Sequence, residues 1–214
     1  MERSSSPSPR RTGRPLSFDR EAALDVAMRL FWQHGYEATS VSALTEAMMI
    51  SPPSLYTAFG DKRRLFREAV ERYLGGASAV AEGIERAPTA HAAARDLLTA
   101  AAIGDTREGM PPGCLLASSI VACSDSAAEV REELAAIRRD IERSLRLRIE
   151  RDIREGLMPA DADADMLAGH VFAVVQGMST LAKDGAGREK LLKIVSSALS
   201  AWPAKDQHRS RESA

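Results

Sequence analysis

The chain has 214 residues and a mass of 23.1 kDa, with 44% hydrophobic and 28% charged residues and a net charge of -1. This length suits one compact domain or two small ones, and the composition excludes a disordered or collagen-like chain. No stretch approaches the roughly 18 uninterrupted apolar residues of a membrane helix, and the start of the chain lacks the apolar core of an export signal. We therefore expect a cytoplasmic protein without a membrane partner.

Residues 1–16 predict a basic, flexible arm. The arm is rich in Ser, Pro and Arg, and its basic residues include Arg10, Arg11 and Arg14. Acidic residues are scarce in the same part of the chain, so positive charge is concentrated there. Such an arm suits a polyanion as its partner.

Apolar residues recur at helical spacing along the chain, whereas no stretch alternates with a period of two for long enough to predict a strand. In the first part we expect helices over about 18–35, 41–48, 52–59 and 61–74. Ser17 or Asp19 would cap the first helix and Thr39 or Ser40 the second. Ser51 would cap the third, whose first-turn positions are Pro52 and Pro53.

The composition becomes Ala-rich beyond Gly75, so we place a boundary near residue 78. It separates a domain over 17–77 from a second over 78–204, and 205–214 would form a disordered tail. The second domain is expected to contain helices over about 88–103, 113–123, 126–153 and 163–182, and a last helix that ends near Trp202. The helix before Gly156 would hold about 28 residues and span roughly 42 Å. The fold class is therefore all-α.

The last two helices predict a subunit interface made of paired helices. Apolar residues spread over most of the circumference of the segment 163–182, so it needs burial on more than one side. The residues expected at this interface are Leu167, Val171, Val174, Val175, Met178, Leu191, Val195, Leu199 and Trp202. Ordinary burial in the core of one chain is the alternative for these residues.

Two short helices joined by a tight turn, over about 40–59, fit a helix-turn-helix whose second helix enters the DNA major groove. The wider run from Phe18 to Tyr73 resembles the DNA-binding domain of TetR/AcrR-family transcriptional regulators, most specifically over 51–62. The resemblance is carried by Ala23, Leu30, Phe31, Gly35, Tyr36, Thr39, Ser40, Val41, Leu44, Ile50, Ser51, Leu55, Tyr56, Phe59, Lys62 and Leu65.

The resemblance implies an N-terminal three-helix helix-turn-helix DNA-binding domain and a helical C-terminal domain for ligand binding and dimerisation. It implies a homodimeric repressor that binds a palindromic double-stranded DNA operator and that an unidentified small-molecule effector releases. It further implies phosphate contacts by Tyr56 and Lys62. Neither a cofactor nor an enzymatic activity is expected, because the sequence lacks a zinc-protease His pair, a phosphate loop and a Gly-x-Ser-x-Gly elbow.

The third helix lacks the residues that usually distinguish bases. Between Ser51 and Ala58 there is no Arg, Lys, Asn or Gln, so bidentate contacts to guanine or adenine are excluded from this helix. We expect single hydrogen bonds from Ser51, Ser54 and Thr57 and contacts between thymine methyl groups and the two prolines, Pro52 and Pro53.

Two other parts of the chain are expected to contact DNA. Arg10, Arg11 and Arg14 would reach a narrow minor groove, unless the arm is merely disordered. Thr39 and Ser40 at a helix start suit a phosphate, a simple capping role, or both.

Met49 occupies a turn position at which the resembled family usually has Gly. A Cβ there would strain a left-handed backbone by about 1 kcal/mol. We therefore expect either an altered turn or a slightly less stable helix pair.

The effector site is unknown from the sequence, with Cys114 and Phe172 as candidates. If 113–123 is one helix, Cys114 and Cys123 lie on opposite faces about 13.5 Å apart, which is too far for a disulfide. They are either buried structural cysteines, or Cys114 at the helix start is a reactive thiol with a lowered pKa. Two alternative functions follow: a regulator that responds to redox through Cys114, and an interaction module that binds protein through 126–155 without binding DNA.

Overall fold

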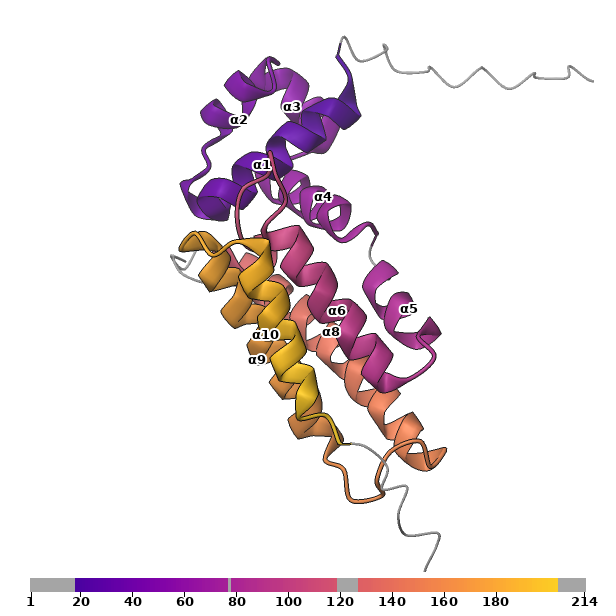
Figure 1. Cartoon of the computed structure of the whole chain (residues 1–214). Helices are drawn as coiled ribbons and strands as arrows, with labels where there is room; N and C mark the ends of the chain where they lie inside the picture. Colours follow the sequence, from indigo (N-terminus) through magenta and orange to yellow (C-terminus); the bar gives the residue numbers. More distant parts are fainter. Residues whose placement is uncertain (1–17, 77, 119–126, 204–214) are drawn as a thin grey trace, which may run out of the picture.

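The computed structural model describes residues 18–76, 78–118 and 127–203, and these form helices and no strand (Figure 1). The expected arm, Cys123 and the expected tail lie outside the described residues. No described helix has both the length and the apolar character needed to cross a membrane.

The N-terminal bundle consists of α1 (Arg20–Ala38), α2 (Val41–Ala47), α3 (Pro52–Phe59) and α4 (Lys62–Leu74). The capping residues that the sequence predicts set these bounds. Asp19 accepts hydrogen bonds from the first backbone amides of α1, and Ser40 and Ser51 cap α2 and α3 in the same way. Gly35, with φ at 80°, interrupts the helical backbone of α1 where the sequence predicts its end.

The helical body consists of α5 (Ala79–Arg86), α6 (Ala90–Asp105), α7 (Leu115–Ser118), α8 (Ala128–Arg154), α9 (Ala164–Lys183) and α10 (Arg188–Ser200). The long helix and the last two helices are confirmed. The sequence did not predict α5, because it is short, holds Gly83 in its middle and has no side-chain cap at Ser78. The helix expected over 113–123 begins at Leu115, and its end lies outside the described residues.

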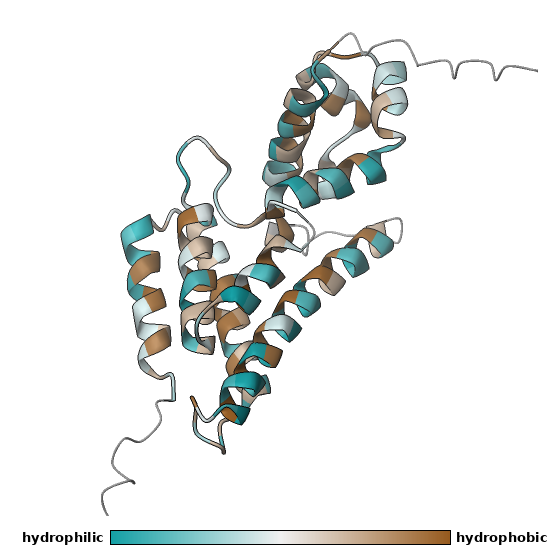
Figure 2. Cartoon of the chain, turned by 90° about the vertical axis from the view of Figure 1, so that its right-hand side faces the viewer, coloured by the Kyte–Doolittle hydropathy of each residue, from teal (hydrophilic) through white to brown (hydrophobic). Residues whose placement is uncertain are grey.

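Two hydrophobic clusters form the core of the molecule. The helices are amphipathic, with brown hydrophobic and teal hydrophilic residues on the same helix in Figure 2. One cluster fills the N-terminal bundle and continues into the body through Leu115 and Leu116 of α7 and Val130 and Leu134 of α8. The other lies within the body, between α5, α6, α8, α9 and α10. The bundle therefore shares a hydrophobic cluster with α7 and α8 of the body.

The loop before α7 is fixed from both sides. The indole Nε1 of Trp32 in α1 donates a buried hydrogen bond of 2.7 Å to the carbonyl of Gly113. The amide of Cys114 donates a 2.8 Å hydrogen bond to the hydroxyl of Ser179 in α9. Gly113 has φ at 78°, and a Cβ on it would lie 2.9 Å from the carbonyl oxygen of Ser179. This position therefore requires glycine, and the loop connects α1 to α9.

Ion pairs form a second connection between the bundle and the body. Arg63 and Arg67 of α4 bind Glu133 of α8, with 2.8 Å between Arg67 Nε and Glu133 Oε2, and Arg63 also binds Glu129. Hydrogen bonds from the two guanidinium groups, that of Arg67 first, lower the pKa of Glu133 to about 2. The carboxylate therefore stays charged at neutral pH and ties α4 to the start of α8.

Met49 occupies the turn between α2 and α3 with φ at 53°, the only positive φ outside glycine among the described residues. Its side chain is 90% exposed. The turn thus keeps its left-handed geometry although the residue has a Cβ. The strain is not offset by packing of the side chain within the chain.

Asp105, the last residue of α6, carries a buried carboxyl group. It is 2% exposed, and no described group donates a hydrogen bond to its Oδ2. Burial raises its pKa to about 6, and the charge of Lys183 on α9 opposes that rise. Compared with the unfolded chain, the folded chain therefore favours the protonated form of Asp105.

Replacing Met49 with Gly is expected to stabilise the fold by about 1 kcal/mol, because the left-handed turn no longer carries a Cβ. For a chain of this size that corresponds to a rise in Tm of about 2–4 °C. Thermal unfolding checks this, with Met49→Ala as the control that shortens the side chain but keeps the Cβ. Equal Tm values for the two variants would contradict the strain.

Replacing Asp105 with Asn removes a charge that is costly to bury. The pKa of Asp105 lies above the ordinary value of about 3.9, so its contribution to stability is full below about pH 4 and is lost as the pH rises through about 6. Asp105→Asn should therefore become more stable relative to the wild type as the pH rises. The difference between the two free energies of unfolding should grow by about 2–3 kcal/mol from pH 4 to pH 7. Denaturant titrations across this range measure the gain. The exposed Asp96→Asn serves as control, and a constant difference for Asp105→Asn would refute the assignment.

Candidate nucleic-acid interface

The third helix lies at the end of the molecule away from the body (Figure 1). Leu55 and Phe59 point into the core, whereas the N-terminal turn and the opposite side of α3 are open. The expected base-contacting residues are all accessible: Ser51, Pro52, Pro53 and Thr57 are exposed and Ser54 is half-buried. The structure therefore brings these five residues together on one surface.

The hydroxyl groups on this surface are already engaged with one another. Ser51 and Ser54 share a hydrogen bond of 2.9 Å, and the Thr57 hydroxyl donates a 2.8 Å bond to the carbonyl of Pro53. Their oxygens keep free lone pairs, while only one hydroxyl proton of the serine pair is left to donate. This surface is thus better suited to accept hydrogen bonds from adenine or cytosine amino groups than to donate to guanine.

The helix-turn-helix itself carries little charge. Residues 41–59 contain one charged side chain, that of Glu46. Pro52 and Pro53 have no N–H, so the start of α3 offers fewer amides to a phosphate than an ordinary helix start. Attraction for the DNA backbone must therefore come from elements next to α2 and α3.

Tyr56 and Lys62 lie at the edge of this surface. Tyr56 is 51% exposed on α3. The ammonium of Lys62 lies 4.4 Å from the centre of the Tyr36 ring and donates a 3.4 Å bond to the carbonyl of Glu37. Burial lowers the pKa of Lys62, and the charge of Glu37 opposes this. The lysine is therefore held against the end of α1, next to the start of α4.

The expected phosphate contact by Thr39 does not fit the structure. Thr39 is 2% exposed, and its hydroxyl donates a 2.7 Å hydrogen bond to the carbonyl of Gly35. It closes the end of α1, while Ser40 is exposed and caps α2 through a 3.0 Å bond from the amide of Ala43. Of the two residues, only Ser40 is accessible to a phosphate.

Arg10, Arg11 and Arg14 lie outside the described residues. Arg20, the next arginine along the chain, belongs to the fold. Its guanidinium lies 4.5 Å from the centre of the Phe59 ring and binds Glu68 of α4 at 2.5 Å. The positive charge of the expected arm therefore depends on the arginines that precede Arg20 in the sequence.

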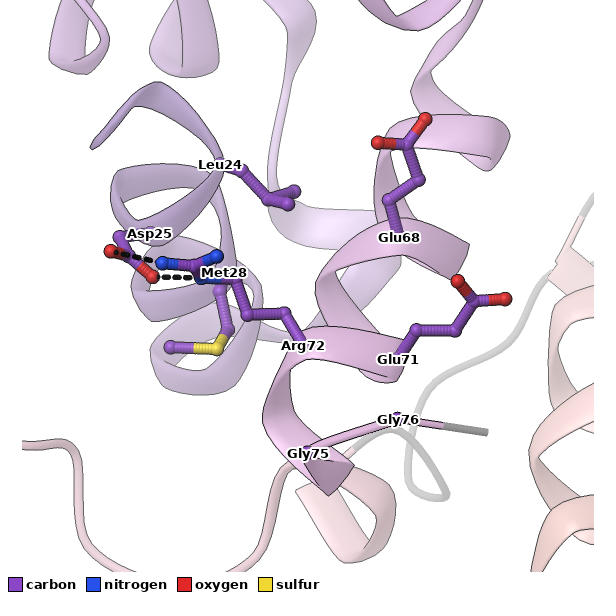
Figure 3. A pocket seen from close by; sticks show the side chains of 8 residues that line it. All are labelled: Leu24, Asp25, Met28, Glu68, Glu71, Arg72, Gly75 and Gly76. Carbon is purple, nitrogen blue, oxygen red and sulfur yellow. Dashed lines mark hydrogen bonds and ion pairs between the residues drawn. The ribbon is translucent and has the colours of Figure 1, made fainter. Parts of the chain in front are cut away.

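The connection from the bundle to the body is braced by α1. An open cleft of about 610 Å³ lies between α1 and α4. Figure 3 shows Arg72 of this cleft bound to Asp25. Arg72 also binds Glu21 at 2.5 Å. These ion pairs hold the end of α4 against α1, so the two helices move as a unit.

The expected subunit-interface residues are largely covered within the single chain. Five of them, Leu167, Val171, Met178, Leu191 and Val195, are buried in the core of the single chain. The other four, Val174, Val175, Leu199 and Trp202, are half-buried and pack against the same core. Apolar periodicity indicates that a residue is buried but not which surface covers it, so it does not distinguish the core of one chain from a subunit interface.

The outward face of α9 and α10 consists of different residues. Met166, His170, Ala173 and Gly177 are exposed along α9 at intervals of three or four, and Leu192 is exposed on α10. Gly177 faces open space, since a Cβ there would contact nothing within 4 Å. Small side chains on this face permit another helix to approach closely.

The long helix α8 exposes one large apolar side chain, that of Leu147, and therefore gives little support to the interaction-module alternative. Its main apolar residues, Val130, Leu134, Leu145 and Ile149, are buried against the rest of the chain. Its accessible positions are mostly Arg, Glu and Asp.

A cavity of about 360 Å³ lies where the bundle meets the body. Both candidate effector residues, Cys114 and Phe172, line it. Leu97, Arg107, Met110, Ile141 and Val175 also line it, within the range of about 88–175 in which the sequence places the walls of the effector site. The sequence missed the part of the wall that comes from the N-terminal bundle, which includes Met28, Trp32, Arg72, Tyr73 and Leu74. The cavity therefore touches α1 and α4 as well as the body.

The thiol of Cys114 does not have the lowered pKa that a reactive cysteine requires. Burial raises its pKa, and a hydrogen bond with the Tyr73 side chain only partly opposes this. The thiol therefore stays protonated at neutral pH, which removes support for a redox role of this residue in the described state.

Comparison with known proteins agrees with this geometry. Residues 23–69 match the family model described as bacterial regulatory proteins, tetR family, and residues 92–189 match a tetracyclin repressor-like C-terminal domain. The chain is 36% identical over 193 residues to the HTH-type transcriptional repressor ComR of Escherichia coli (strain K12), across 89% of this chain and 92% of that protein. It is 46% identical over 63 residues to the HTH-type transcriptional repressor BdcR of the same strain, across 29% and 32% of the two chains.

Solved structures show the same relationship. A cysteine-substituted variant of the TetR family transcriptional regulator CifR, complexed with double-strand operator DNA of 26 base pairs, is 42% identical with a TM-score of 0.82. The similarity covers 89% of this chain and 100% of that one. A TetR regulator from Rhodococcus sp. RHA1 is 38% identical with a TM-score of 0.62, over 86% and 99% of the chains. The chain belongs to the TetR family of DNA-binding transcriptional regulators, which are not enzymes.

Proposed function

We propose that the protein is a homodimeric repressor that binds a palindromic operator and is released from it by a small molecule. The observation that carries the proposal is the outward surface of α3 in a chain that is similar over most of its length to CifR in its operator complex. The names of ComR and BdcR support repression. A cytoplasmic location belongs to the proposal, because the operator is genomic DNA.

Sequence discrimination would rest on α3 and on DNA shape. Ser51, Ser54 and Thr57 would accept hydrogen bonds from base amino groups, and Pro52 and Pro53 would contact thymine methyl groups. Backbone contacts would come from Ser40, Tyr56 and Lys62. Arg10, Arg11 and Arg14 would add minor-groove binding, which supplies the charge that residues 41–59 lack.

Dimerisation would use the outward face of α9 and α10 rather than the buried residues beneath it. Met166, Ala173 and Gly177 on α9 and Leu192 on α10 provide apolar and small side chains for a two-fold related copy. In such a pair the two copies of α3 would meet half-sites about one helical turn apart.

Release would follow from occupation of the cavity between bundle and body. Trp32 and Tyr73, which line the cavity, belong to the helices that hold the bundle in place. A ligand that prefers a rearranged junction by 100-fold would shift the DNA-binding equilibrium by about 2.7 kcal/mol.

Operator binding can be measured with a duplex selected by the protein from a random pool. We expect a complex of two chains per duplex that weakens steeply with salt. Thr57→Val should cost about tenfold in affinity and relax the preference at one base pair per half-site, because the hydroxyl acceptor is lost. Removing residues 1–14 should reduce the salt slope.

The control for Thr57→Val is Ser144→Ala on α8, which should bind like the wild type. Failure to enrich any sequence would contradict operator binding. One chain per duplex would contradict the dimer.

A further inference from the structure

The charged side chains that the described residues contribute to the cavity at the junction are all of one sign. Within the described part of its wall, Arg72 and Arg107 are the only charged residues, and neither Asp nor Glu contributes to it. The remainder is largely apolar and includes Trp32, Leu97 and Phe172. A cationic ligand would therefore meet arginine side chains and no carboxylate among the described lining residues.

The two arginines differ in the carboxylate partners of their guanidinium groups. Arg72 is engaged by two carboxylates, those of Asp25 and Glu21. Arg107 lies on the loop between α6 and α7, is exposed, and forms no ion pair with any described residue. Arg107 thus supplies the cavity with a guanidinium whose donors are open to a ligand.

The polar groups deeper in the wall are neutral. The side chains of Tyr73 and Cys114 are hydrogen-bonded to each other, and burial raises the pKa of both. Trp32 already donates its N–H to Gly113. The interior therefore offers contact surface for an apolar group, and Arg107 offers the only charge without an ion pair among the described lining residues.

We propose that the cavity binds a small amphipathic carboxylate, with its apolar body among Trp32, Leu97 and Phe172 and its carboxylate on Arg107. A guanidinium pairs with a carboxylate through short, charge-assisted hydrogen bonds. The apolar body gains by leaving water. This inference rests on the proposed ligand-released function, for which it specifies the chemical class of the effector.

Trp32 provides a direct signal for the test, because the chain has two tryptophans and Trp202 is the other. In the full-length Trp202→Phe protein, fluorescence of Trp32 is titrated with octanoate, octanol and octylamine. We expect octanoate to bind about tenfold more tightly than octanol, and octylamine more weakly than both. The shift in Tm with each probe is the second measurement, made on the wild type.

The decisive variant is Arg107→Gln, which should lower octanoate affinity about tenfold and leave octanol affinity unchanged. Arg86→Gln, an exposed arginine far from the cavity lining, is the control and should behave like the parent protein. Equal affinity for octanoate and octanol, or an octanoate preference that survives in Arg107→Gln, would overturn the proposal. Absence of binding by all three probes would also overturn it.

Operator binding without a probe is measured on the same samples. If the operator is bound but octanoate is not preferred, the effector class is wrong and the regulatory function stands. If octanoate is preferred but no operator is bound, the proposed function fails and the cavity assignment stands.

Discussion

The buried hydrogen bond from Trp32 to the carbonyl of Gly113 connects residues 81 positions apart and joins the two halves of the molecule. A typical hydrogen bond of this kind contributes about 1 kcal/mol, but leaving the buried N–H and carbonyl without partners costs about 1–3 kcal/mol. The bond therefore acts mainly by penalising arrangements in which bundle and body separate. The edge-to-face contact of Trp32 with Tyr73, with 4.9 Å between ring centres, restricts the same movement, as do the ion pairs of Arg63 and Arg67 with Glu133.

This constraint explains how a chain with so little charge on its helix-turn-helix can act at a defined DNA site. The direction of α3 is set by α1 and α4, and both helices are fixed to the body. In the proposed dimer, affinity would depend on whether two such surfaces match the spacing of the half-sites. The cavity lies at the same junction, so under the proposed function a ligand that repacks Trp32 or Tyr73 would change the direction of α3 without contacting it.

Local chemistry made most of the helix bounds predictable. Asp19, Ser40 and Ser51 cap the helices that their side chains indicate, and Gly60 follows the end of α3 as expected. Apolar periodicity also located α8, α9 and α10. Such signals act within a few residues, so they do not depend on the partner against which a helix packs.

Pairings between distant segments could not be predicted in the same way. In the sequence Thr39 is a candidate helix cap, but in the structure its hydroxyl donates a hydrogen bond to the carbonyl of Gly35. Arg20 is close in sequence to the basic arm, but its guanidinium binds Phe59 and Glu68. Leu191 and Val195 are apolar on a helix whether a second copy or the chain itself covers them. The wall of the cavity is built from α1, α4, α5, α6, α7, α8 and α9 with the loop before α7, and no single segment carries its pattern.

The most direct test of a rigid junction is operator binding as the half-sites are moved apart. With five base pairs inserted, the second half-site turns to the opposite side of the duplex, and the wild type should lose at least about tenfold in affinity. Trp32→Phe, which keeps an aromatic ring but lacks the N–H, should lose less on insertion because its bundle is less firmly held. Equal affinity of the wild type for both spacings would contradict the claim that the body fixes the direction of α3.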